Sequence, residues 1–382
     1  MATTVILGGG VGGLVTANTL RRRLDPKHRI VLVDRSAQHV FTPSFLWMML
    51  GWREPRAISR DLGRLSRKGI EVVQEEILEI DPARRRVKTA RQELAADHLV
   101  VSLGAEAWPG AVPGLAAAGC NLYDLAGTLR LRDALAGFRS GRIAVLVAGV
   151  PFKCPAAPYE AAMLIEASLR QRGLRERSQM DVYTPETLPM PVAGKALGEA
   201  VKGMVEGKGI GFHPQHKLAA VEPARRELTF ENGVKTGYDL LVVVPPHRCP
   251  PVVKDAGLTG ETGWVPVDRA TLATRHERVL AIGDVAAIKL PVGLPLPKAG
   301  VFAHAEAKVV AHNIAAELTG RGAPAAFDGV GYCFVEMGDG VAAYAKGNFY
   351  AEPAPAMTLR SPSRLWHWGK IYFEKWWLRR WF

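Results

Sequence analysis

The feature that most constrains this chain is a run of glycines near its start. A short apolar stretch, residues 5–7, leads into the glycines of a GxGxxG motif, namely Gly8, Gly10 and Gly13. A helix-forming segment to residue 23 follows, and then a second apolar run, 29–34, which ends in Asp34, 21 positions after the last motif glycine. Strand, glycine turn, helix, strand and acid in this order predict a dinucleotide-binding βαβ unit, because the glycines let a pyrophosphate approach the backbone at the helix start.

Later apolar runs continue the alternation of strands and helices. Strands are expected at 97–105, 142–149, 181–183, 238–244 and 278–284, and helices at 159–172 and 297–318. This pattern predicts an α/β fold with two Rossmann-like dinucleotide-binding domains. Proline-rich breaks suggest a discontinuous first domain, 1–113 and 255–322, a second domain, 114–254, and a C-terminal region, 323–382.

The expected second unit lacks the glycines that a nicotinamide nucleotide would require. After Gly149 the chain reads Val-Pro-Phe-Lys-Cys-Pro, with prolines and bulky side chains where the backbone should meet a pyrophosphate. In their place stands Cys154, next to Lys153 and close to an expected helix start. Such surroundings are expected to lower the pKa of the thiol and to favour the nucleophilic thiolate.

The chain has four cysteines, Cys120, Cys154, Cys249 and Cys333. They are too few and too widely spaced for a disulfide scaffold, and no CxxC pair points to zinc, so no metal site is expected. Taken singly, each cysteine could be a buried apolar residue, which is a common state of the free thiol.

Three motifs together resemble the FAD-containing pyridine nucleotide–disulfide oxidoreductase superfamily: the glycine motif with Asp34, the strand end 103–105 and the strand end 282–284. The resemblance covers nearly the whole chain and implies FAD as the cofactor of the first domain. It implies that Asp284 contacts the flavin ribitol and Asp34 the adenosine ribose, although Asp284 could instead cap a turn. The cofactor-binding residues expected are Gly8, Gly10, Gly13, Asp34, Arg35, Gly104, Gly283, Asp284 and Lys298.

Two segments around cysteines carry a finer resemblance. Residues 154–160, which read Cys-Pro-Ala-Ala-Pro-Tyr-Glu, and residues 331–340 around Cys333 are similar to the sulfide:quinone oxidoreductases and the flavocytochrome c sulfide dehydrogenase flavoproteins. The resemblance implies that Cys154 and Cys333 form a redox disulfide. It further implies that HS⁻ attacks this disulfide and leaves a persulfide on one sulfur, that FAD accepts the electron pair, and that the product is zero-valent sulfur or polysulfide.

The same resemblance suggests roles for two more residues. Glu160 is the candidate proton carrier, with an exposed helix carboxylate as the alternative. Lys298, in a turn similar to the flavin-contacting turn of these families, is expected to stabilise negative charge on the reduced flavin. A lysine at a helix start is disfavoured by the helix dipole unless an anion is near. At the position of a third family cysteine the chain has Tyr123, and a role for Cys120 stays open.

The C-terminal segment is rich in tryptophan. Read as a helix, it places on one side Leu365, Trp366, Gly369, Tyr372, Phe373, Trp376 and Trp377, and on the other Arg364, His367, Lys370, Glu374 and Lys375. This pattern, with a net charge of +12, predicts a helix lying in an anionic lipid surface through residues 360–382. A helix packed on the protein's own core is the alternative. No apolar run is long enough to span a bilayer, so a peripheral protein of a bacterial or archaeal cytoplasmic membrane is expected.

A membrane flavoenzyme without a nicotinamide motif favours quinone as electron acceptor, and the aromatic residues proposed for its site are Phe334, Phe349 and Tyr350. No motif supports nucleic-acid binding. A homo-oligomer is compatible with the sequence. Because no cysteine precedes Cys120 and no export signal is evident, we expect FAD to be non-covalent and disfavour a flavocytochrome c partner. The rivals left open are a type II NADH:quinone oxidoreductase, a flavocytochrome c-type sulfide dehydrogenase flavoprotein, and a non-catalytic membrane flavoprotein whose cysteines are core residues.

Overall fold

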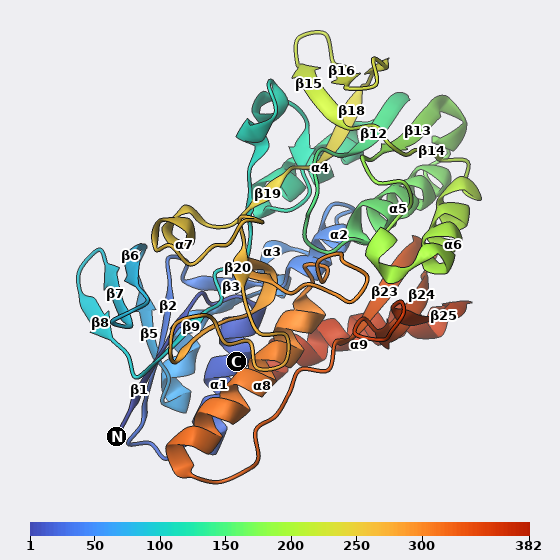
Figure 1. The fold of residues 1–382 in the computed structure, drawn as a ribbon. Helices are drawn as coiled ribbons and strands as arrows, with labels where there is room; N and C mark the ends of the chain where they lie inside the picture. Colours follow the sequence, from blue (N-terminus) through green and yellow to red (C-terminus); the bar gives the residue numbers. More distant parts are fainter.

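Two parallel five-stranded sheets form the framework of the computed structural model, which describes residues 1–382 (Figure 1). The first sheet has the order β21 (Val279–Ala281), β9 (His98–Val101), β1 (Thr3–Leu7), β2 (Arg29–Asp34) and β5 (Glu71–Gln74). The second has the order β11 (Cys120–Asn121), β18 (Leu240–Val244), β12 (Gly141–Val147), β13 (Ser178–Tyr183) and β14 (Gly211–His213). The predicted α/β class with two Rossmann-like units is therefore confirmed.

Helices cover both sheets. On the first sheet, α1 (Val11–Arg23) packs along the long helix α8 (Gly300–Thr319), as Figure 1 shows. Around the second sheet lie α4 (Leu125–Gly137), α5 (Ala157–Gln171) and α6 (Lys195–Glu206). The short helices are α2 (Phe45–Met48), α3 (Pro55–Ile58) and α7 (Pro251–Asp255). Apolar residues of β1, β2 and β9 are buried on both faces, as expected for parallel strands between layers.

Two glycines determine how closely α1 approaches β1. Gly8 has a φ of +99°, and a Cβ on Gly13 would lie 1.9 Å from the Gly8 carbonyl oxygen. Any side chain at Gly13 would therefore separate the helix from the strand. The motif glycines serve packing as well as ligand approach.

Antiparallel strands complete the fold. The C-terminal sheet consists of β23 (Val330–Gly338), β24 (Val341–Asn348) and β25 (Ala356–Ser363), and β23 packs against α5. One three-stranded sheet consists of β6 (Ile77–Asp81), β7 (Arg86–Thr89) and β8 (Glu93–Ala95). Another consists of β15 (Leu218–Glu222), β16 (Glu227–Phe230) and β17 (Lys235–Gly237). The two-stranded pairs are β3 (Gln38–Val40) with β4 (Ser59–Asp61), β10 (Glu106–Ala107) with β19 (His247–Arg248), and β20 (Val265–Pro266) with β22 (Ala286–Ala287).

The C-terminal helix α9 (Arg364–Arg380) packs against the protein through both polar and apolar side chains. Lys370 and Glu374 are buried, and the Glu374 carboxylate accepts hydrogen bonds from the Ser44 hydroxyl at 2.6 Å and from Arg53 Nε at 2.9 Å. The predicted division of α9 into an apolar stripe and an opposite charged side does not match the burial, because Lys370 and Glu374 of the charged side are buried along with Trp377 of the stripe. Residues 360–363, expected within the helical segment, belong instead to strand β25.

The tryptophans of α9 divide between the core and the surface. Trp377 and Trp381 are buried, and Trp366 stacks on Tyr344, whereas Trp368 is 65% exposed. The exposed apolar side chains of α9 are Leu365, Trp368 and Tyr372, so the exposed stripe keeps two residues of the predicted one and adds Trp368. None of the helices combines the length and apolar character needed to cross a membrane.

Candidate active site

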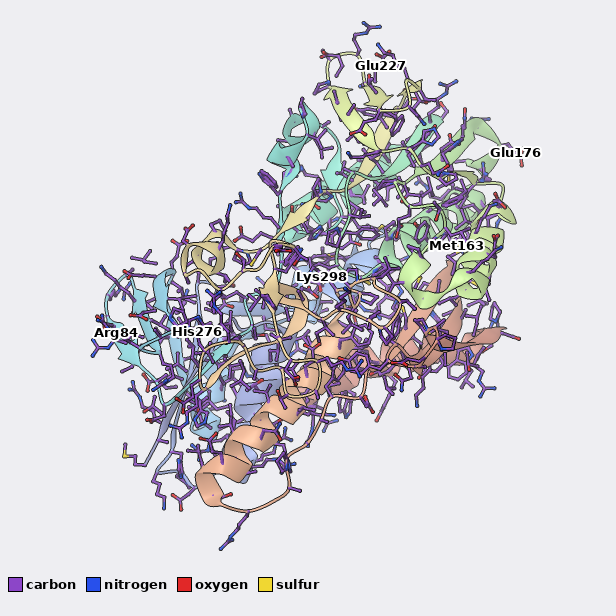
Figure 2. The ribbon with its side chains drawn as sticks, viewed as in Figure 1. Arg84, Met163, Glu176, Glu227, His276 and Lys298 are labelled. Carbon is purple, nitrogen blue, oxygen red and sulfur yellow. The ribbon has the colours of Figure 1, made fainter.

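A single large cavity of about 2020 Å³ lies where the carboxyl ends of the two parallel sheets face each other. Lys298, labelled in Figure 2, lies between the two sheets. Of the residues predicted for the site, those that line the cavity are Gly8, Gly10, Asp34, Arg35, Gly104, Cys154, Glu160, Gly283, Asp284, Lys298, Cys333, Phe334 and Phe349. The carboxyl edge of parallel strands is the usual place for ligands in such folds.

The first-sheet end of the cavity is open to backbone approach. A Cβ on Gly10 would meet no atom within 4 Å, so the space over the start of α1 is free. The Asp34 carboxylate ends β2 and accepts the Gly9 amide at 2.6 Å. The exposed Arg35 side chain lies 3.8 Å from Glu106. A helix N-terminus beside a carboxylate at this spacing suits a pyrophosphate and a ribose.

Asp284 carries an unsatisfied polar atom. Its Oδ1 is buried and has no hydrogen-bond partner, and burial raises the pKa of this carboxyl, with Lys153 and Lys298 opposing the shift. Buried polar atoms are normally hydrogen-bonded. An unpartnered oxygen on the wall of a large cavity therefore fits a hydroxyl-bearing ligand chain.

Lys298 is held at the centre of the cavity wall. Its ammonium donates to the Asp284 carbonyl at 2.5 Å and lies 3.4 Å from the ring centroid of Trp264. Burial lowers the pKa of Lys298 to about 8, although Asp284 opposes this shift. A buried ammonium at this point can stabilise an anion in the cavity.

Cys154 joins the second sheet to the Lys298 turn. Its backbone N–H donates to the Lys298 carbonyl at 2.7 Å, and its own φ is +49°, in the left-handed region. The expected lowering of the thiol pKa was wrong: burial, reinforced by Glu160, raises the pKa of Cys154 to about 12. The cation that opposes this rise in the Cys154 pKa is Lys370, while the Lys153 ammonium donates to the Ala105 carbonyl at 3.4 Å.

Cys333 reaches the same cavity from β23. Its thiol donates to the Phe334 carbonyl at 3.3 Å, and burial raises its pKa, with Glu160 and Cys154 adding to the shift. Both cysteines are free thiols here. The fold thus brings together two cysteines that are 179 positions apart in the sequence.

The remaining cysteines lie elsewhere. Cys120, in β11, and the buried Cys249 are absent from the cavity lining. Tyr123 occupies the neighbouring wall instead, and its hydroxyl donates to the Cys154 carbonyl at 3.2 Å.

Glu160 is buried on α5, so the alternative of an exposed helix carboxylate was wrong. Its Oε1 accepts the Lys370 ammonium at 2.6 Å and the Glu336 amide at 2.8 Å. Lys370 also lines the cavity, whereas the sequence pattern placed it only on the side of α9 opposite the apolar stripe and gave it no role in the site. Sequence periodicity offered no signal for it, because its partner lies 210 positions away.

Glu186 is a further carboxyl group on the cavity wall, and the sequence did not predict it. It accepts a hydrogen bond from the Tyr159 hydroxyl at 2.7 Å, and burial raises its pKa to about 7.

Among the aromatic residues proposed for quinone, Phe334 and Phe349 line the cavity and Tyr350 does not. Tyr350 packs against Phe327 and donates its hydroxyl to the Arg269 carbonyl, so the structure does not place it at this site.

Comparison with known proteins identifies the family. Residues 2–309 match the family model described as pyridine nucleotide-disulphide oxidoreductase. The chain belongs to this family. The predicted superfamily resemblance is therefore confirmed.

Two relatives of this pyridine nucleotide-disulphide oxidoreductase cover most of its length. The mitochondrial sulfide:quinone oxidoreductase of Mus musculus is 24% identical over 363 residues, covering 91% of this chain and 78% of the relative. The sulfide-quinone reductase of Aquifex aeolicus (strain VF5) is 27% identical over 393 residues, covering 98% and 90%. The X-ray structure of the Aquifex aeolicus sulfide:quinone oxidoreductase matches with a TM-score of 0.88 and 24% identity, covering 100% of this chain and 91% of that one. This likeness shows that the two folds agree.

The cofactor implied for this pyridine nucleotide-disulphide oxidoreductase is FAD, and the cavity fits it. The open backbone at Gly10, the carboxylate of Asp34 and the unpartnered oxygen of Asp284 would hold the pyrophosphate, the ribose and the ribitol. FAD supplies two-electron transfer beside the cysteines when bound. The structure contains no group of three or more His, Cys, Asp or Glu side chains that could hold a metal ion.

Proposed function

We propose that this chain is an FAD-dependent enzyme that oxidises sulfide to zero-valent sulfur or polysulfide and reduces a quinone. The observation that carries the proposal is the meeting of Cys154 and Cys333 on one cavity that also has a dinucleotide cradle. The names of the relatives support the same substrates. The sequence after β12 has no glycine motif for a nicotinamide nucleotide, which favours sulfide over NADH as the electron donor.

The cysteines perform the first chemical step. HS⁻ attacks a Cys154–Cys333 disulfide, so the bond between the two cysteines breaks and a new S–S bond forms. One cysteine becomes a persulfide and the other leaves as a thiolate, which carries the negative charge that HS⁻ brought. FAD bound beside the cysteines would accept the electron pair as the disulfide reforms and the oxidised sulfur leaves. For each H₂S converted, one quinone takes up two electrons and two protons.

Charged residues around the cysteines assist this step. Glu160, buried and bonded to Lys370, accepts protons from the sulfide side. Lys298 stabilises negative charge that develops near the Asp284 turn. Phe334 and Phe349 contribute apolar walls to the quinone side of the cavity.

We also propose that α9 attaches the protein to an anionic membrane surface. Leu365, Trp368 and Tyr372 are 68%, 65% and 70% exposed and follow one another at helical spacing. Exposed Arg379 and Arg380 at the end of α9 add positive charge. The domain limits 1–113 with 255–322, 114–254 and 323–382 belong to this proposal, with the last region carrying both Cys333 and the lipid contact.

An anaerobic reduction experiment tests the donor. The purified holoenzyme is mixed with sulfide or, separately, with NADH, and the visible flavin absorbance is followed. We expect rapid loss of the absorbance with sulfide, its return on adding a short-chain quinone, and little change with NADH. Loss of absorbance with NADH alone would instead identify a type II NADH:quinone oxidoreductase. No response to either donor would favour a non-catalytic flavoprotein.

A further inference from the structure

Sulfide oxidation creates a proton problem at the cysteines. H₂S must lose a proton to attack as HS⁻, and Glu160, the proposed acceptor, is buried, whereas Cys154 and Cys333 are partly exposed and line the cavity. A proton accepted by Glu160 needs an onward route, because a buried carboxylate that cannot pass on its proton works only once.

Four polar side chains extend from the cysteines toward the surface. Glu160 on α5 accepts the Lys370 ammonium of α9 at 2.6 Å. One turn earlier on α9, His367 Nδ1 lies 2.9 Å from a carboxylate oxygen of Glu336, on β23. The Glu336 side chain is fully buried, and its backbone N–H donates to Glu160.

His367 forms the outer end of this chain of side chains. Its side chain is 15% exposed and lines a groove of about 570 Å³, separate from the main cavity. The charged residues of the groove are Arg53, Asp339 and Arg364. Lys370 lines the main cavity and not the groove, so the network spans the protein layer between the two spaces.

Lys370 supplies the link between the two carboxylates. No hydrogen bond joins it to the Glu336 carboxylate in this arrangement, so the flexible lysine side chain must turn to reach it. Burial lowers the pKa of Lys370, but attraction by Glu160 and then by Glu336 outweighs burial and raises it overall. The ammonium is thus attracted by both carboxylates.

We propose that Lys370, Glu336 and His367 form a proton exit route from Glu160 to the surface groove, a role that rests on the proposed sulfide oxidation. Lys370 gives a proton to Glu336, so an N–H bond breaks and an O–H bond forms, and Lys370 then takes the proton held by Glu160. Glu336 passes its proton to His367 Nδ1, and the other ring nitrogen releases one to water in the groove. Lys370 and Glu160 line the main cavity, where the cysteines react. Glu336 and His367 do not line it and act only through Lys370 and Glu160.

Other charged groups face the route from neighbouring elements. Cys333 precedes Glu336 on the same strand, and Cys154 lies before α5. Glu374, one turn after Lys370, is already paired with Arg53. Glu374 is therefore neutralised by Arg53. On β23 and α9 this leaves Glu336 as the carboxylate that can exchange protons with His367 and Lys370.

The test compares His367→Gln and Glu336→Gln with the native holoenzyme. Both glutamines keep hydrogen-bonding atoms near their partners but cannot relay protons. We expect each variant to bind FAD normally and to be reduced by sulfide at least about tenfold more slowly, with a larger solvent deuterium isotope effect. Added imidazole, which can enter the groove, should restore the rate of His367→Gln and not that of Glu336→Gln. His276→Gln, at a histidine that lines neither the cavity nor the groove, is the matched control and should match the native rate.

Native rates in both variants would overturn the route, and so would slow reduction that imidazole does not restore in His367→Gln, because that result indicates a structural role. If Glu336→Gln fails to bind FAD, the imidazole response and isotope effect of His367→Gln decide alone. Failure of the native holoenzyme to react with sulfide is a different result, which counts against the proposed function.

Discussion

The backbone N–H of Cys154 donates a 2.7 Å hydrogen bond to the carbonyl of Lys298. This contact connects the loop after the second sheet's central strand to the turn before α8, on the first sheet. The proposed redox cysteine is therefore positioned by the element that also holds the cavity lysine.

Removal of either cavity cysteine should abolish the reaction with sulfide. We expect Cys154→Ser and Cys333→Ser to lose at least about 100-fold in the rate of flavin reduction by sulfide, because neither can form the disulfide that HS⁻ attacks. FAD content should stay unchanged. Cys120→Ser is the control, since Cys120 does not line the cavity, and stopped-flow absorbance measures all three. Native rates in Cys154→Ser would exclude the proposed disulfide.

Substitution of Gly10 should separate folding from cofactor binding. A Cβ at this position meets no protein atom within 4 Å, so Gly10→Ala should fold. The added methyl group would, however, occupy the space expected for the pyrophosphate. We expect FAD affinity to fall at least about tenfold, measured by flavin fluorescence on titration of the apoprotein. Gly137→Ala, in α4 and equally free of contacts, should bind FAD normally. Equal affinities in the two variants would contradict the assigned cradle.

Lys298 should give the flavin reduction rate a distinct pH dependence. Its pKa is lowered to about 8, chiefly by burial, so the ammonium is charged below this pH and lost as pH rises through it. We expect Lys298→Met to reduce the sulfide-driven rate at least about tenfold at pH 7, with the ratio to the native rate approaching one well above pH 8. Comparing both proteins at each pH cancels the ionisation of sulfide itself. A ratio independent of pH would refute the assignment.

Glu306 should make stability depend on pH. Burial raises its pKa from 4.5 to about 7, while its carboxylate accepts the Gly283 amide at 2.6 Å. Because the pKa of Glu306 is higher in the folded state than in the unfolded state, its contribution to the free energy of unfolding is fully present below about pH 4.5. This contribution is lost as pH rises through about 7. Glu306→Gln keeps an acceptor without the charge and should be more stable than the native protein at pH 8 by up to about 3 kcal/mol. Urea unfolding at pH 4.5 and pH 8 measures the change, and an equal difference at both would contradict it.

The exposed stripe of α9 should govern membrane binding. We expect simultaneous replacement of Leu365, Trp368 and Tyr372 by serine to weaken binding to phosphatidylserine-containing vesicles at least about tenfold in a flotation assay. Reduction of a water-soluble quinone should persist, since none of these three side chains lines the cavity. Leu78→Ser, on β6 and 55% exposed, should bind vesicles normally. Undiminished binding of the triple variant would remove α9 as the attachment surface.

Local patterns in the sequence were sufficient for much of the fold. The strand predicted at 29–34 forms as β2, and the helix expected at 159–172 forms as α5, because each was recognised from an apolar run that lies within a single element. The expected strands 97–105 and 278–284 are shorter, ending at Val101 and Ala281. Their last residues turn into the cavity wall, where backbone atoms face a ligand site rather than another strand.

The sequence by itself determined the dinucleotide motif, the order of strands and helices, and the two cysteine segments that mark the family. Only the tertiary structure decided that Lys370 and Glu374 point inward, that burial raises the thiol pKa of Cys154, and that Tyr350 lies off the cavity. The physical reason is that burial and charge pairing depend on segments distant in the chain. Glu160 and Lys370 meet across 210 positions, and no local pattern around either residue specifies the other.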